Sequence, residues 1–206
     1  MCIVIGFVGF DGTGKTTQAQ KLQHALSMQG IKANYVHVFS PKSTISSELT
    51  KHHTIDALLG TLDNLSESRS GTIMELSIRL PSLLLESWIT IIRERCQDNV
   101  SIYDRYFYDK AIAILSSYSK TLNLRIKKKI LLVTKLLPKP DITIAFRITP
   151  EVANKRKKEH TLKEAKEICA LYDELTRILS IKTVNAENGI NDVQLNIQSL
   201  CQKAFT

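Results

Sequence analysis

Residues 9–16 read Gly-Phe-Asp-Gly-Thr-Gly-Lys-Thr and fit the pattern G-x-x-x-x-G-K-[ST] at every fixed position. An apolar segment, 2–8, precedes this motif, and a segment with helical periodicity, 15–28, follows it. Glycines let the backbone turn tightly, so that its N–H groups can point inward at phosphate oxygens. The helix that follows adds the positive end of its dipole. The motif therefore predicts a phosphate-binding loop between a buried strand and a helix.

The predicted loop supplies side chains for a nucleoside triphosphate. A lysine at the position of Lys15 reaches the β- and γ-phosphates, and a hydroxyl at the position of Thr16 can coordinate Mg²⁺. We therefore expect ATP and Mg²⁺ as ligands, and the alternative is a glycine-rich turn that binds nothing. The expected ATP-binding residues are Gly9, Asp11, Gly12, Thr13, Gly14, Lys15, Thr16 and Thr17.

A carboxylate follows a second short apolar segment. Residues 100–103 are expected to form a buried strand, and Asp104 comes directly after them. Ligands of open α/β sheets bind at the carboxyl ends of the strands, which would place Asp104 on the same edge as the loop. We expect Asp104 to hold Mg²⁺ together with Thr16. The alternative is that Asp104 is a turn residue or a helix cap.

Short apolar segments alternate with helical patterns along the whole chain. This alternation predicts βαβ units and an α/β fold with a parallel sheet covered on both faces. No linker or internal repeat interrupts residues 1–206, so we expect a single domain. The expected strands are 2–8, 33–39, 100–103, 141–148 and 181–184, and the expected helices are 15–28, 73–96 (with Pro81 starting or kinking a helix), 109–117, 122–137, 150–158, 162–179 and 191–204.

The charge of the chain is unevenly distributed. The net charge is +8, and residues 120–166 contain 14 Lys and Arg but 4 Asp and Glu. Such a region favours anionic ligands, which include phosphate esters, nucleic acids and membrane surfaces. A nucleic-acid platform would interleave aromatic residues with the basic ones, and the run 127–129 lacks them. We interpret that run as a solvated helix face and expect no nucleic-acid partner.

Two further observations bear on location. No segment reaches about 18 uncharged apolar residues, so no membrane span is expected. The four cysteines form no C-x-x-C pair, and the apolar segment 2–8 lacks the basic flank of a signal peptide. We therefore expect a cytoplasmic protein with free thiols.

Phosphate loops serve kinases, GTPases and motor ATPases. The guanine-reading N-K-x-D segment of GTPases is missing, and motor ATPases are usually longer than 206 residues. These features favour a small-molecule kinase.

The chain resembles the thymidylate kinase family of nucleoside monophosphate kinases. The motifs that carry the resemblance are 9–18, Asp104-Arg105-Tyr106, 137–141, 149–156 and 184–193. The resemblance implies a P-loop NTPase fold with a five-stranded parallel sheet in the order 2-3-1-4-5, flanked by helices, and a short helical lid at about 150–165. It also implies transfer of phosphate from ATP to dTMP, and a homodimer packed through helices, for which the apolar stretch 83–92 could serve as surface or equally as core.

Site residues follow from the same resemblance, position by position. Asp11 would face the sugar of the acceptor, and Arg105 would hold its phosphate. Lys42 stands where the family has an arginine that touches this phosphate. The loop carries no arginine at its variable positions, so the catalytic arginine is expected in the lid, at Arg156. Lys15, Asp104 and Arg156 form the expected catalytic set.

The acceptor half departs from the family. The family has a thymine-reading arginine at the register of 83–85, where this chain has three leucines. Arg79, about one helical turn earlier, is the candidate substitute. Ala113 stands where the family has an aromatic residue that excludes a 2′-hydroxyl. Asp109 replaces a serine and would either contact the acceptor hydroxyl or cap a helix. A different small acceptor, such as a nucleoside, a sugar or a metabolite hydroxyl, and a non-catalytic ATP-binding protein remain the alternatives.

Overall fold

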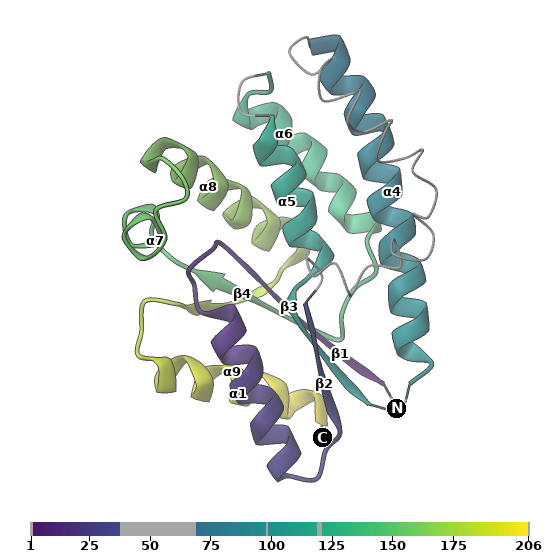
Figure 1. Cartoon of the computed structure of the whole chain (residues 1–206), viewed down its shortest axis with the longest axis vertical. Helices are drawn as coiled ribbons and strands as arrows, with labels where there is room; N and C mark the ends of the chain where they lie inside the picture. The colour runs from purple at the N-terminus through teal and green to yellow at the C-terminus, as the bar shows by residue number, and fades with distance from the viewer. Residues whose placement is uncertain (1, 38–68, 98, 119–120, 206) are drawn as a thin grey trace.

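The structure is a computed structural model that describes residues 2–37, 69–97, 99–118 and 121–205. Its centre is a five-stranded parallel sheet with the order β2-β3-β1-β4-β5 (Figure 1). The predicted α/β P-loop fold and its strand order are confirmed. The strands are β1 (Ile3–Gly9), β2 (Ala33–His37), β3 (Val100–Arg105), β4 (Ile142–Arg147) and β5 (Lys182–Asn185).

Strand β1 occupies the middle of the sheet and pairs with β3 on one side and β4 on the other. Six of its seven residues are buried, which explains why 2–8 is an almost continuous apolar run. Strand β3 runs to Arg105, two residues beyond the predicted end. Asp104 therefore lies within the strand rather than after it.

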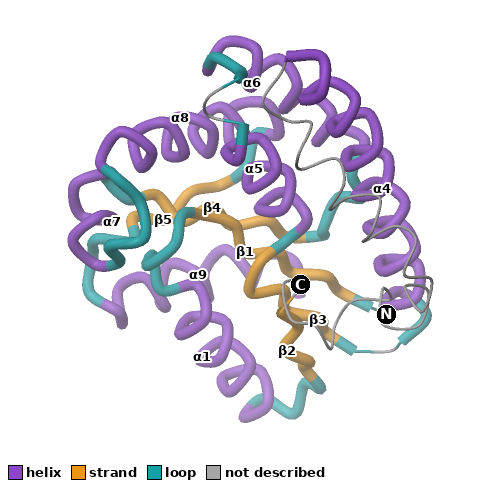
Figure 2. The backbone as a smooth tube through the Cα atoms, turned by 45° about the horizontal axis from the view of Figure 1, so that its top comes forward, coloured by secondary structure: helices purple, strands orange, loops and turns teal. Residues whose placement is uncertain are grey.

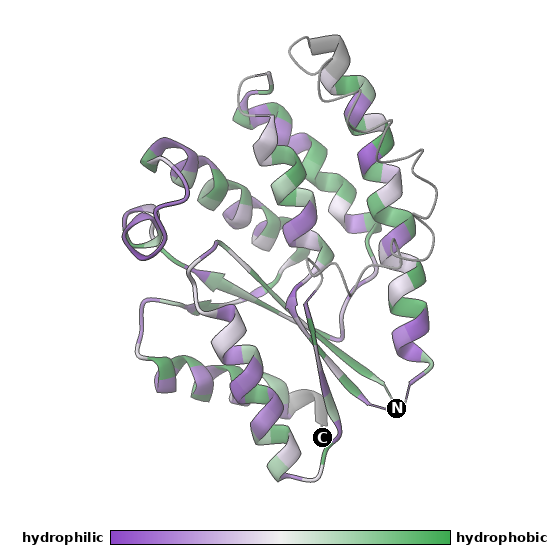
Figure 3. Ribbon diagram, in the orientation of Figure 1, coloured by the Kyte–Doolittle hydropathy of each residue, from purple (hydrophilic) through white to green (hydrophobic). Residues whose placement is uncertain are grey.

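Helices cover both faces of the sheet (Figures 1 and 2). Helices α1 and α9 pack on one face around Phe7, Leu22 and Ile197, and α4, α5 and α8 pack on the other. The helices are α1 (Lys15–Met28), α4 (Arg69–Arg95), α5 (Phe107–Ser117), α6 (Leu124–Ile130), the 3₁₀ helix η1 (Leu131–Leu136), α7 (Pro150–Arg156), α8 (Leu162–Leu179) and α9 (Ile190–Phe205). Figure 3 shows most of them as ribbons with mixed hydrophilic and hydrophobic residues, as expected of helices packed on one side.

Two helix predictions need correction. Helix α4 begins before the expected start and continues across Pro81. The single helix expected over 122–137 is divided into α6 and η1. Helix α6 is capped by Asn123, whose side-chain oxygen accepts the N–H of Ile126 at 3.0 Å.

The interpretation of 127–129 as a solvated face is wrong for Lys127. This side chain is fully buried between α6 and α8, and its ammonium group pairs with Glu167. Lys128 is half-buried and lies 3.7 Å from Glu174. Two of the three basic side chains are thus matched by acidic residues of α8.

Apolar side chains on α4 divide between core and surface. Leu83 and Ile91 are buried, whereas Leu85, Trp88 and Ile92 are exposed. The stretch 83–92 therefore belongs partly to the core, and the homodimer remains a prediction. Within the described ranges, no helix combines the length and apolar character needed to cross a bilayer.

Candidate active site

The phosphate loop adopts backbone angles that favour glycine. Gly12 and Gly14 have φ of 80° and 83°, and Gly14 directly precedes α1. At Gly9, a Cβ atom would lie 2.8 Å from the carbonyl oxygen of Phe146, so only glycine permits this approach of β1 to β4. The glycines of the motif therefore serve both the turn and the strand packing beneath it.

The side chain of Lys15 folds back into the phosphate loop. Its Nζ donates to the carbonyl oxygens of Gly9 and Phe10, both at 2.7 Å, and to Thr13 Oγ1 at 3.2 Å. Burial lowers the pKa of the Lys15 ammonium, while the charge of Asp109 acts in the opposite direction. The loop thus surrounds a desolvated cation.

Asp104 lies beside the first turn of α1. Its Oδ2 accepts the hydroxyl of Thr16 at 2.7 Å, so two predicted metal ligands are in direct contact. The residue is fully buried, and Oδ1 has no hydrogen-bond partner in the structure.

These residues fit a magnesium ion. Hydroxyl and carboxylate oxygens are the ligands that Mg²⁺ prefers, and an unpartnered buried carboxylate oxygen is available to the ion or to its water. No cluster of three or more His, Cys, Asp or Glu suited to a metal occurs in the described part of the chain.

Arg105 and Asp11 meet next to this carboxylate. A guanidinium nitrogen of Arg105, at the end of β3, pairs with Asp11 Oδ1 in the loop. Both side chains are partly exposed, at 25% and 22%. Two residues predicted to contact the acceptor therefore lie together on the sheet edge that carries the loop.

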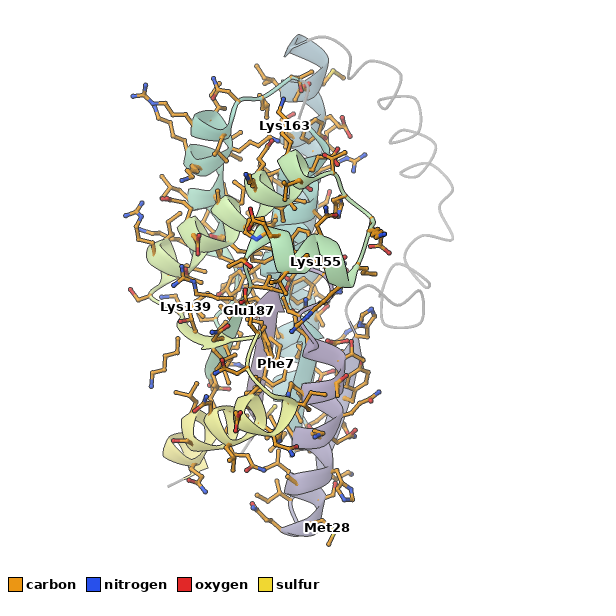
Figure 4. All side chains as sticks on the ribbon, turned by 90° about the vertical axis from the view of Figure 1, so that its left-hand side faces the viewer. Phe7, Met28, Lys139, Lys155, Lys163 and Glu187 are labelled. Carbon is orange, nitrogen blue, oxygen red and sulfur yellow. The ribbon has the colours of Figure 1, made fainter. Side chains whose placement is uncertain are left out.

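Arg156, the last residue of α7, reaches over the phosphate loop. Its Nη1 donates to the carbonyl of Ala186 at 2.9 Å and lies 3.5 Å from the carbonyl of Gly12. The start of α7 is held by Glu187 (labelled in Figure 4), which accepts the N–H of Thr149 at 2.7 Å. This bond lowers the pKa of Glu187. The expected lid segment thus brings an arginine to the loop.

Comparison with known proteins agrees with this geometry. The family model described as Thymidylate kinase matches residues 7–197. The chain belongs to the thymidylate kinase family. This membership assigns it to the phosphotransferases.

Two curated members of the thymidylate kinase family are similar to the chain. It is 31% identical over 164 residues to "Thymidylate kinase" of Pelodictyon phaeoclathratiforme, covering 77% of this chain and 67% of that protein. It is 32% identical over 161 residues to "Thymidylate kinase" of Chlorobium phaeobacteroides, covering 75% and 65%. The chain therefore spans about two thirds of the length of these relatives.

In this chain, Asp109 caps helix α5. Its Oδ2 accepts the N–H of Tyr106 at 3.1 Å, and its Oδ1 accepts the N–H of Gly9 at 3.0 Å and the hydroxyl of Tyr172 at 2.7 Å. Burial raises the pKa of the Asp109 carboxyl, although Lys15 opposes the shift. Of the two roles considered, the bond to Tyr106 is that of the cap, and a contact of Asp109 with the acceptor stays a prediction.

Arg79 and Lys42 are the two remaining acceptor candidates. Arg79 Nη2 pairs with the buried Glu75 at 2.6 Å on its own helix, α4. Lys42 lies outside the described residues. Their roles in the thymidylate kinase reaction stay predictions.

Several contacts near the loop were not predicted from the sequence. Tyr35 and His37 contact Asp104, Tyr172 contacts Asp109, and the carbonyl of Ala186 accepts from Arg156. Tyr35 and His37 lie two residues apart on one strand and so face the same side, but this spacing does not show that they face Asp104. Tyr172 comes from α8 and carries no such local signal.

Proposed function

We propose that this chain is an ATP- and Mg²⁺-dependent nucleoside monophosphate kinase that phosphorylates dTMP to dTDP. The observation that carries the proposal is the contact of Thr16 with Asp104 at the edge where Lys15 fills the phosphate loop. Family membership and the names of the two similar proteins support dTMP as the acceptor. A cytoplasmic role in nucleotide biosynthesis accords with this activity.

The donor side of the site would bind the triphosphate. Lys15 would exchange its bonds to loop carbonyls for bonds to phosphate oxygens, and the backbone N–H groups of the loop would bind further oxygens. Thr16 and Asp104 would hold Mg²⁺, which when bound neutralises the charge that develops on the phosphates.

The acceptor side would be organised by Arg105 and Asp11. The planar guanidinium of Arg105 can bind a phosphate through two parallel hydrogen bonds, and Asp11 keeps it oriented until the acceptor arrives. Arg156 would stabilise negative charge on the transferred group from the lid side. Catalysis then rests on position and charge rather than on covalent chemistry.

A second candidate is a kinase with the same donor site and another small acceptor. Three observations favour it. Leu83, one of the three leucines at the register of the thymine-reading arginine, is buried against the core, and Arg79 is paired with Glu75. Ala113 on α5 is exposed and too small to exclude a 2′-hydroxyl.

A coupled ADP-release assay separates the candidates. Mg-ATP would be supplied with dTMP, dUMP, dCMP, dGMP, AMP, thymidine or one of several sugars. The proposal predicts strong stimulation by dTMP. Stimulation by another compound alone would favour the second candidate, and ADP release that no acceptor changes would indicate an ATPase or a nucleotide-binding protein without transfer.

A further inference from the structure

Strand β2 directs two polar side chains at the buried carboxylate of Asp104. The hydroxyl of Tyr35 donates to Asp104 Oδ2 at 2.8 Å, and Nδ1 of His37 lies 3.0 Å from the same oxygen. Thr16 donates to this oxygen as well, at 2.7 Å. Three groups from two different elements therefore converge on one oxygen atom.

An irregularity in the sheet makes this convergence possible. Strands β2 and β3 pair regularly up to Val36 and Tyr103, but the next pair is His37 with Arg105. Asp104 is thus an extra residue on β3, opposite no residue of β2. Such bulges twist a strand and redirect a side chain, and they are frequent next to active sites.

The distribution of donors is asymmetric. Among the residues that the structure describes, Oδ2 of Asp104 has three partners, whereas the buried Oδ1 has none. A carboxylate that served the packing of the fold alone would leave a costly unsatisfied oxygen. The arrangement is explained if Oδ1 is kept available for a ligand.

The phenol of Tyr35 is suited to hold this carboxylate. Its hydroxyl lies at the tip of a rigid ring on β2 and donates to Asp104 Oδ2. The side chain of His37 is 34% exposed, so it reaches the carboxylate from the solvent side.

We propose that Tyr35 and His37 are positioning residues of the metal–nucleotide site. They hold Asp104 through Oδ2, so that Oδ1 remains oriented for the cation or its water. This inference rests on the proposed function, because it concerns the Mg²⁺ of the bound triphosphate. Groups that orient a metal ligand in this way typically change metal affinity by about 10- to 100-fold when they are removed.

The test measures metal binding directly. Binding of Mn²⁺, a spectroscopic substitute for Mg²⁺, would be followed by electron paramagnetic resonance with ATP present. The variants are Tyr35→Phe, His37→Leu and His37→Asn, of which the last keeps an N–H group near the place of Nδ1. The control is His24→Leu, at an exposed position of α1. ATP binding in EDTA and thermal unfolding would be measured for every protein.

We expect Tyr35→Phe and His37→Leu each to weaken Mn²⁺ binding by about tenfold. ATP binding in EDTA should be unchanged, His37→Asn should recover much of the loss, and His24→Leu should match wild type. Mn²⁺ affinities equal to wild type in all variants would overturn this inference and leave the proposed function untouched. An equal loss of ATP binding in EDTA would overturn it too, because it would indicate a structural role. Wild-type protein that binds no Mn²⁺ with ATP would overturn the proposed function itself.

Discussion

Tyr172 donates its hydroxyl to Asp109 Oδ1 at 2.7 Å, and the backbone N–H of Gly9 donates to the same oxygen at 3.0 Å. Tyr172 belongs to α8, the helix that follows the lid segment, and Gly9 is the first residue of the phosphate loop. The other oxygen of Asp109 caps α5 by accepting the N–H of Tyr106. One buried carboxylate therefore fixes the loop, α5 and α8 relative to one another.

Removal of the Tyr172 hydroxyl should destabilise the protein. In Tyr172→Phe the buried Asp109 loses one donor, and we expect the free energy of unfolding to fall by about 1–2 kcal/mol. Urea denaturation measures this change. The control is Tyr103→Phe, which removes a buried hydroxyl that has no hydrogen-bond partner in the structure and should not lower stability. Equal stability of Tyr172→Phe and wild type would contradict this role.

Asp109 should give the protein a characteristic pH dependence. Burial raises the pKa of this carboxyl in the folded state above its value in the unfolded chain. The folded state then binds the proton more tightly, so this group's contribution to stability is greatest at low pH and is lost as pH rises through the folded-state pKa.

Comparison with Asp109→Asn isolates that contribution. The variant cannot ionise, and in either orientation its NH₂ group faces an N–H or O–H donor, so we expect it to be less stable than wild type at low pH. The difference in the free energy of unfolding between wild type and variant should narrow as pH rises from 4 toward 8, because only the wild type must ionise a buried group. Urea denaturation across that range measures it, and a difference that widens with pH would contradict the prediction.

Arg156 should affect turnover more than nucleotide binding. Arginines that stabilise the transferred phosphoryl group contribute about a thousand-fold or more to kcat, and Arg156→Ala should lose a factor of that order. The matched control is Lys155→Ala, which removes a neighbouring exposed cation (labelled in Figure 4). Steady-state kinetics with the preferred acceptor measures both. Equal kcat values in the two variants would contradict a specific role of Arg156 and would indicate that only the overall positive charge of α7 affects turnover.

The pair of Lys127 and Glu167 should respond unequally to substitution. Lys127 is fully buried, whereas Glu167 is 23% exposed. Glu167→Leu leaves a buried cation without its partner and should lower the free energy of unfolding by about 3 kcal/mol. Lys127→Met fills the same volume and leaves an anion that water can reach, so its cost should be clearly smaller. Thermal or urea unfolding tests the order, and a larger loss in Lys127→Met would contradict it.

Local patterns predicted much of the fold. The burial of β1 on both faces appears in the sequence as an apolar run, and the glycines of residues 9–14 mark the turn that follows it. The contact of Thr16 with Asp104 follows from the rule that parallel strands end at one edge of the sheet. These features depend on neighbours along the chain or on simple topology.

Features that depend on distant partners were not predictable in this way. Lys127 looks like a surface lysine until Glu167, 40 residues later, is packed against it. The bond of Tyr172 to Asp109 spans 63 residues. The bulge at Asp104 has no marker such as glycine in the sequence, so the contacts of Tyr35 and His37 became visible only with the register of β2 and β3.

The central claim is that the loop around Lys15 transfers phosphate from ATP to a nucleotide. The most direct measurement follows radiolabel from the γ-phosphate of ATP into dTMP, with wild-type protein and with Lys15→Ala, whose fold is checked by circular dichroism. We predict labelled dTDP with wild type and loss of most activity in the variant. Full transfer by Lys15→Ala with normal ATP affinity, or no labelled dTDP from wild-type protein that binds ATP, would contradict the account.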